Sequence, residues 1–119
     1  MNKPIFLTVS LRILAGRRSE FESTARKMVA ETKQEHGALV YEFYVTEDAT
    51  ECRLLEGYVD NDAAASHLTG PVVIGLVPKL LESATLEAFE VYGHASPQLV
   101  EILAAFRAKL FGIVDGFRR

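Results

Sequence analysis

The chain has 119 residues, which is enough for one domain with a modest hydrophobic core. Hydrophobic residues make up 49% and charged residues 24%, a balance that is typical of a soluble globular protein and argues against disorder. The net charge is −3 and no basic stripe is present, so we expect no nucleic-acid partner.

A single cysteine, Cys52, excludes an intrachain disulfide and a cysteine-rich metal site. It suits a reducing cytoplasm, and its place in a predicted strand indicates a buried, unreactive thiol. The first residues, MNKPIFLTVSLRILAG, alternate as a strand does and make a poor signal peptide. No apolar run is long enough to cross a bilayer, so we expect no membrane contact.

Residues 5–14 alternate between two faces and predict a half-buried strand. Ser19 and Glu22 have the spacing of a capping box, and apolar residues then recur at helical spacing. We therefore expect a helix that Ser19 caps, with His36 in its last turn and Gly37 as its C-cap.

Residues 38–46 and 51–59 predict two strands of a hairpin. In a simple register Tyr41 lies opposite Glu56. Both then share one face with four other residues, namely Leu39, Phe43, Leu54 and Tyr58. A carboxylate on such an apolar face needs a partner or has a chemical role.

The remaining elements are a short helix over 62–69 that Asp60 or Asn61 caps, and a helical segment over 72–82 that Pro78 should kink or restart. A strand over 84–92 follows, and Ser96-Pro97 is a strong helix start. The final helix carries an apolar stripe that consists of Leu99, Ile102, Leu103, Phe106 and Leu110, and that extends to Ile113 and Val114.

This order, β-α-β-β-α-β plus a C-terminal helix, predicts an α+β, ferredoxin-like fold with helices on one face of an antiparallel sheet. The other face would expose Val40, Leu55 and Val59 to water. Because large exposed apolar patches are uncommon on monomers, we expect a two-fold symmetric homodimer.

Three segments then add a resemblance: 37–42 (GALVYE), 55–60 (LEGYVD) and 63–68 (AAASHL). They form a small-residue turn with Tyr, a strand that ends in Glu-x-aromatic, and a helix that carries His about ten residues later. In this order they resemble the antibiotic biosynthesis monooxygenase (ABM) domain of the dimeric α+β barrel superfamily. Nearly the whole chain fits, so we expect residues 1–119 to form a single ABM-like domain with a C-terminal helical extension from about residue 97.

The resemblance implies a cavity between sheet and helices in each subunit. Some relatives oxidise quinols or aromatic polyketide intermediates with molecular oxygen and no cofactor, other relatives degrade haem, and many have no established activity. Haem-degrading relatives rely on an Asn on the first strand, a Trp two residues after the strand Glu, and a His. This chain has Thr8 and Ser10 on that strand, with Asn2 too early, and Tyr58 in place of the Trp, which weakens the haem interpretation.

Cofactor-free oxygenation needs a general base, donors for an anion and a water-poor pocket. His67 is our candidate base, because imidazole titrates near neutral pH. Glu56 would orient it or act as a burial-raised base. Tyr41 and Tyr58 would line the substrate pocket together with Leu39 and Leu54. We expect no metal and no organic cofactor, and an aromatic or quinol-like small molecule as the ligand.

Structural interpretations stay open for each of these residues. His67 and Glu56 can form a purely structural pair, and Tyr41 and Tyr58 can be core aromatics. The corresponding function is a non-enzymatic small-molecule-binding or stress-related dimer with a vestigial cavity, and haem binding is a second alternative. The three histidines lie at 36, 67 and 94, a spacing that does not indicate a metal site.

Overall fold

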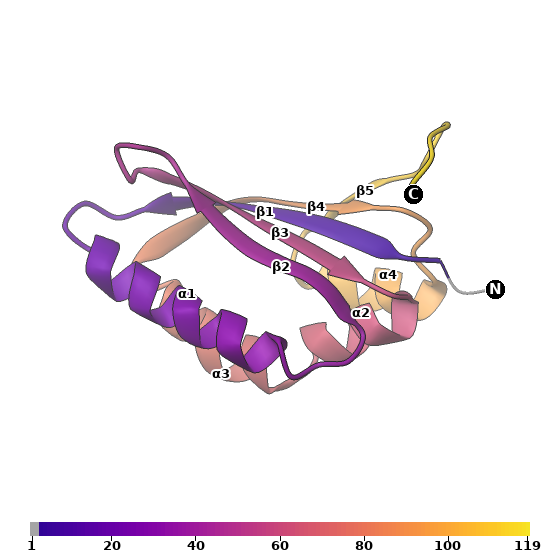
Figure 1. The fold of residues 1–119 in the computed structure, drawn as a ribbon, viewed down its shortest axis with the longest axis horizontal. Helices are drawn as coiled ribbons and strands as arrows, with labels where there is room; N and C mark the ends of the chain where they lie inside the picture. Colours follow the sequence, from indigo (N-terminus) through magenta and orange to yellow (C-terminus); the bar gives the residue numbers. More distant parts are fainter. Residues whose placement is uncertain (1–2) are drawn as a thin grey trace.

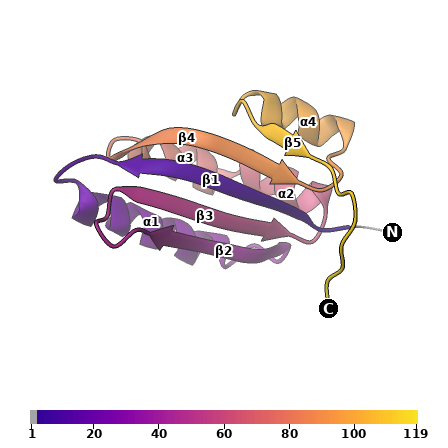
Figure 2. The same cartoon turned by 90° about the horizontal axis from the view of Figure 1, so that it is seen from above.

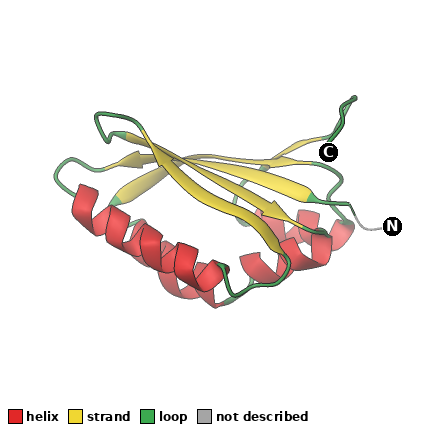
Figure 3. Cartoon of the chain, in the orientation of Figure 1, coloured by secondary structure: helices red, strands yellow, loops and turns green. Residues whose placement is uncertain are grey.

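A computed structural model of the chain describes residues 3–119, so Asn2 and the start of the predicted domain lie outside the described residues. The fold is α+β and ferredoxin-like, as predicted, with one sheet and helices packed on one of its faces (Figures 1 and 3). In chain order the elements are β1 (Ile5–Ile13), α1 (Arg18–Thr32), β2 (Ala38–Val45), β3 (Glu51–Tyr58), α2 (Asn61–Leu68), α3 (Pro71–Leu80), β4 (Ala84–Tyr92), α4 (Pro97–Ala104) and β5 (Lys109–Phe111).

The sheet has five strands in the order β2-β3-β1-β4-β5, and it is antiparallel except for the β4–β5 pair. Figure 2 shows β5 and α4 beside β4, at the edge of the sheet farthest from β2. The core lies between the sheet and the helix layer. Its largest fully buried side chains are Tyr58, Phe21, Ile5, Leu7, Met28, Leu99 and Leu103.

The hairpin register is confirmed where it matters for the site, because Tyr41 lies opposite Glu56. The predicted face of Leu39 is wrong. A β-bulge between Ala38 and Val40 leaves Leu39 unpaired and 55% exposed, so it does not share the inner face with Tyr41. The extra residue shifts the alternation by one position, which a strict period of two does not anticipate.

The predicted capping box on α1 is wrong, because the helix begins at Arg18 and its N-cap, Arg17, makes no side-chain cap bond. Glu22 instead pairs with Arg18 at 2.7 Å and Arg26 at 3.2 Å, one helical turn to either side. The C-terminal prediction is also wrong. The helix ends at Thr32, so His36 and Gly37 lie in the turn that leads to β2.

Gly37 has a packing role. A Cβ atom on Gly37 would lie 2.5 Å from the Cβ of Ala63 on α2, which no real side chain tolerates. The missing side chain therefore lets the turn between α1 and β2 rest directly on α2.

The second half of the chain follows the prediction as far as α4. Asp60 caps α2 by accepting a hydrogen bond from the Ala63 amide at 2.9 Å, and Ser96 caps α4 in the same way through Leu99 at 3.2 Å. The predicted restart at Pro78 is wrong, because Pro78 lies inside α3 and the helix continues through it to Leu80.

The predicted C-terminal helix over 97–119 is wrong beyond Ala104. The chain turns at 105–108, where Arg107 has a φ of +54°, and it then adds β5 in parallel to β4. Leu110 lies in that strand, while Ile113 and Val114 are 72% and 101% exposed. The free edge of β4 gives the backbone of β5 hydrogen-bonding partners that a continued helix would not use.

The prediction of a buried thiol at the single cysteine is confirmed. Cys52 is buried, and burial raises the pKa of its thiol to about 11, which makes it a poor nucleophile. Within the described part of the chain, every helix is too short or too polar to span a bilayer.

Candidate functional site

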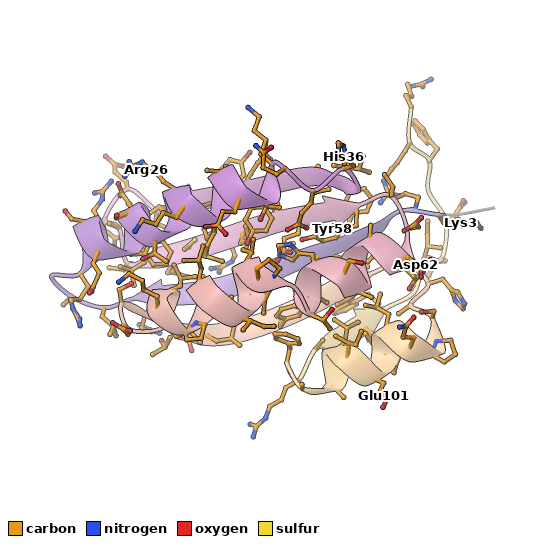
Figure 4. All side chains as sticks on the ribbon, turned by 90° about the horizontal axis from the view of Figure 1, so that it is seen from below. Lys3, Arg26, His36, Tyr58, Asp62 and Glu101 are labelled. Atoms are coloured by element: carbon orange, nitrogen blue, oxygen red, sulfur yellow. The ribbon has the colours of Figure 1, made fainter. Side chains whose placement is uncertain are left out.

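A small cavity of about 60 Å³ lies between the inner face of the sheet and the helices α2 and α3. Its walls are apolar except for a few groups at one end. The lining residues include Val9, Leu11, Met28, Tyr41, Leu54, Glu56, His67, Val73, Val77, Leu81, Leu86, Phe89 and Phe106. Figure 4 looks onto the helix layer, with Tyr58 labelled on the sheet behind it.

Glu56 supplies a carboxyl group to this cavity from the middle of β3, and it is only 4% exposed. The hydroxyl of Tyr58, two residues later on the same face, donates a hydrogen bond to Glu56 Oε1 at 2.5 Å. Burial raises the pKa of Glu56, although His67 and the Tyr58 hydrogen bond act in the opposite direction. The site therefore favours a protonated Glu56 more than water does.

His67 reaches the same place from α2 and is 2% exposed. Its Nδ1 atom lies 2.9 and 3.1 Å from the two carboxylate oxygens of Glu35. Its Nε2 atom lies 3.7 Å from Glu56 Oε1. Since the Glu35 carboxylate is a hydrogen-bond acceptor, we assign the proton to Nδ1, which leaves Nε2 with a free lone pair.

Glu35 is the residue that the sequence analysis missed. It lies in the turn between α1 and β2, and its side chain is 31% exposed. That side chain also lines a wider surface cleft of about 570 Å³, whose other polar residues include Glu31, Gln34 and Ser66. The close contact that Gly37 permits between this turn and α2 places Glu35 within reach of His67.

The two predicted tyrosines flank the imidazole. The ring centroids of Tyr41 and Tyr58 lie 5.3 and 5.2 Å from that of His67. Burial, followed by the nearby charge of Glu56, raises the pKa of both phenols, so both hydroxyls keep their protons. Tyr41 lines the cavity, whereas Tyr58 serves as the hydrogen-bond donor behind Glu56.

Of the two predicted pocket leucines, the structure brings one to the site. Leu54 lines the cavity and is 4% exposed. Leu39 lies outside the cavity because of the bulge in β2.

The arrangement is a chain of four polar groups, Glu35–His67–Glu56–Tyr58, that meets an otherwise apolar cavity. A histidine held by a carboxylate at one nitrogen is suited to accept a proton at the other. The cavity is smaller than the roughly 150 Å³ that holds a benzene molecule, so an aromatic ligand requires side chains to move. Across residues 3–119, no three His, Cys, Asp or Glu side chains group closely enough to hold a metal ion.

The family comparison covers these same residues. Residues 4–74 match the family described as antibiotic biosynthesis monooxygenase (ABM). The chain belongs to this family. The matched region includes Glu35, Tyr41, Glu56, Tyr58 and His67. No curated protein sequence matches the chain.

Several solved structures share the ABM-family fold at low sequence identity. MupZ from Pseudomonas fluorescens is 21% identical with a TM-score of 0.85, and the match covers 99% of this chain and 96% of that one. The match to MupZ therefore includes the segment after β4. Rv0793 from Mycobacterium tuberculosis is 22% identical (TM-score 0.69; 79% and 97% covered). SnoaB from Streptomyces nogalater, described as a cofactor-independent oxygenase, is 17% identical (TM-score 0.68; 79% and 95% covered). At these identities the likeness concerns the fold.

Proposed function

We propose that this ABM-family protein is a cofactor-independent monooxygenase that acts on a quinol or an aromatic polyketide-like molecule. The observation that carries the proposal is His67, which is held at Nδ1 by Glu35 and presents Nε2 at the inner end of an apolar cavity. The description of SnoaB as a cofactor-independent oxygenase supports the same reaction class.

In the proposed reaction His67 Nε2 accepts the hydroxyl proton of the bound substrate, and Glu35 stabilises the resulting imidazolium. The substrate anion transfers one electron to dioxygen, and the two radicals combine in a new carbon–oxygen bond. The resulting peroxide anion takes the proton back from His67 and becomes a hydroperoxide. It then loses water as its O–O and C–H bonds break, which leaves a carbonyl group. One oxygen atom stays in the product, the other leaves as water, and the substrate carbon is oxidised.

Glu56 has a separate role in this proposal. Burial favours its protonated form, and a protonated carboxyl can donate a hydrogen bond to the substrate anion. Tyr58 supports Glu56 by donating a hydrogen bond to its Oε1 atom. The orienting role that the sequence suggested for Glu56 passes to Glu35, whose two oxygens both lie within 3.1 Å of Nδ1.

The test is oxygen uptake with a panel of anthrones and reduced naphthoquinones. We expect uptake with at least one of them, and a fall of at least about tenfold in His67→Ala, in line with the usual contribution of a general base. His94→Ala is the matched control, because His94 lies on a loop away from the cavity and should leave uptake unchanged. No uptake across the panel, or full uptake in His67→Ala, would contradict the proposal.

One observation favours a second candidate, a non-enzymatic small-molecule-binding or stress-related protein. The cavity of about 60 Å³ is well below the several hundred Å³ of typical ligand pockets. The two candidates differ in turnover: the second predicts saturable binding of aromatic compounds without oxygen uptake. Haem binding, the third candidate, needs far more room than this cavity has, and a Soret shift on haem titration would reveal it.

We further propose a homodimer formed through the outer face of the sheet. That face carries Val40 and Leu55, with Val59 and Tyr44, which are 38% and 54% exposed in the single chain. Multi-angle light scattering of the untagged protein at micromolar concentration should give twice the chain mass. A monomer under these conditions would contradict the proposal. The cytoplasmic location stays a prediction.

A further inference from the structure

The two ends of the cavity differ in their access to solvent. At the inner end, Glu56 and His67 are 4% and 2% exposed. At the other end, between α3 and β4, Leu81 and Leu86 also line the cavity, yet they are 41% and 42% exposed. The mouth of the cavity therefore lies between α3 and β4, on the side away from β2.

Phe106 is one of the residues that line this cavity. It follows α4 and is half-buried. Its ring stacks on that of Phe89 of β4, with centroids 5.2 Å apart and planes at 28°. Figure 2 shows α4 and β5 beside the C-terminal part of β4, at the edge of the sheet away from β2. Phe106 thus belongs to the part of the chain that lies beyond the ABM match over residues 4–74.

The backbone on both sides of Phe106 is held in a defined position. Leu99 and Leu103 anchor α4 in the core at 1% exposure each, and the amide of Phe106 donates to the Leu103 carbonyl at 3.0 Å. Directly after Phe106, Arg107 adopts a φ of +54°, a conformation that a non-glycine residue rarely holds without a reason. The phenyl ring itself has apolar contacts, so it can rotate away from the mouth without breaking a hydrogen bond.

We propose that Phe106 closes the mouth of the cavity and sets the size of the aromatic ligand that the cavity takes. It is a specificity-determining residue and not a catalytic one. Rotation of its ring away from Phe89 would enlarge the cavity of about 60 Å³ and make room for a multi-ring ligand. This inference rests on the proposed function in one respect, namely that this cavity is the ligand site.

The test uses binding, so that it does not depend on turnover. Phenol, 1-naphthol and 9-phenanthrol are titrated calorimetrically into the wild-type protein, Phe106→Ala, Phe106→Leu and Phe111→Ala. Phe111 is the matched control, because it belongs to the same C-terminal segment but stacks on Tyr92, outside the cavity lining. Tm values confirm that each variant is folded.

We expect Phe106→Ala to improve the affinity for 9-phenanthrol relative to phenol by at least about tenfold, and Phe106→Leu to improve it by a smaller factor. Phe111→Ala should match the wild type. If Phe106→Ala does not fold, the shift in Phe106→Leu decides. Binding with the same size preference in all four proteins would overturn the inference about Phe106 and leave the proposed function standing. Absence of binding in every protein would overturn both.

Discussion

The same three-residue pattern, Glu-x-Tyr, occurs on three strands of this sheet, and comparing the copies shows what makes one of them a candidate site. In each copy the tyrosine hydroxyl donates a hydrogen bond to the glutamate two residues earlier. The pairs are Glu42–Tyr44 on β2 at 3.1 Å, Glu56–Tyr58 on β3 at 2.5 Å, and Glu90–Tyr92 on β4 at 2.8 Å.

The copies differ in their surroundings. Glu42 and Tyr44 are exposed, whereas Glu56 and Tyr58 are covered by α2 and lie beside His67. Burial raises the pKa of Glu56 and turns a surface pair into a group that can exchange a proton inside the protein. The Glu-x-Tyr pattern provides the hydrogen bond on each strand. Burial under α2 and the neighbouring His67 make the Glu56–Tyr58 pair a candidate for proton transfer.

The largest difference between the copies should appear when the hydroxyl is removed. Tyr58→Phe leaves a buried carboxyl without its donor, and we expect it to lower the free energy of unfolding by about 2–3 kcal/mol. Tyr44→Phe makes the same chemical change on the surface and should alter stability by less than about 0.5 kcal/mol. Urea titrations measure both. Equal losses in the two variants would remove the distinction between the copies.

A second, somewhat smaller effect tests how closely the turn between α1 and β2 packs against α2, the helix that covers Glu56 and Tyr58. Gly37→Ala places a methyl group 2.5 Å from Ala63 and must push the turn that carries Glu35 away from α2, which should cost about 1–2 kcal/mol. Gly75→Ala is the matched control. A Cβ atom added to Gly75 in α3 would meet open space, so the gain in helix propensity should stabilise the protein by up to about 1 kcal/mol. Thermal unfolding measures the effect of each substitution. A Tm of Gly37→Ala that equals or exceeds that of the wild type would contradict the close contact between Gly37 and Ala63.

The smallest effect concerns pH. Because the pKa of Glu56 is raised in the folded protein, the folded state binds its proton more tightly than the unfolded state does. Its contribution to stability is fully present below the ordinary value of 4.5 and is lost as the pH rises toward the raised pKa, at about 1.4 kcal/mol per pKa unit.

Glu56→Gln should therefore remove this loss and flatten the dependence of unfolding free energy on pH above 4.5. Glu42→Gln, at the exposed copy, should leave the dependence as in the wild type. Urea midpoints from about pH 4 to about pH 8 provide the comparison. A wild-type slope that persists in Glu56→Gln would show that the slope comes from another group.

The sequence predicted most of the fold because its strands alternate cleanly. The strand over 84–92 matches residue for residue, and Tyr41 pairs with Glu56 as expected. Leu39 was misplaced because a bulge adds one residue to one strand, and nothing in the alternation marks where. The final helix was overextended because the apolar spacing continues past Ala104, while the turn at Arg107 carries neither glycine nor proline.

The site was predictable in part for the same reason. Glu56, Tyr41 and His67 stand out as polar or aromatic residues on apolar faces, and the structure brings them together. Glu35 lies in a polar stretch, TKQEHG, where one more carboxylate carries no signal. Its contact with His67 depends on how closely a turn approaches a helix 32 positions later in the chain, which is a tertiary property.

The proposed deprotonation of a bound ligand by His67 in the buried site is tested most directly by anaerobic absorption spectroscopy. 1-Naphthol is added without oxygen, at a pH where the free compound is neutral, to the wild-type protein and to His67→Ala. We expect the naphtholate spectrum on binding to the wild type and the neutral spectrum in the variant. Neutral naphthol bound to both proteins, or naphtholate bound equally by both, would contradict the assignment of His67 as the base.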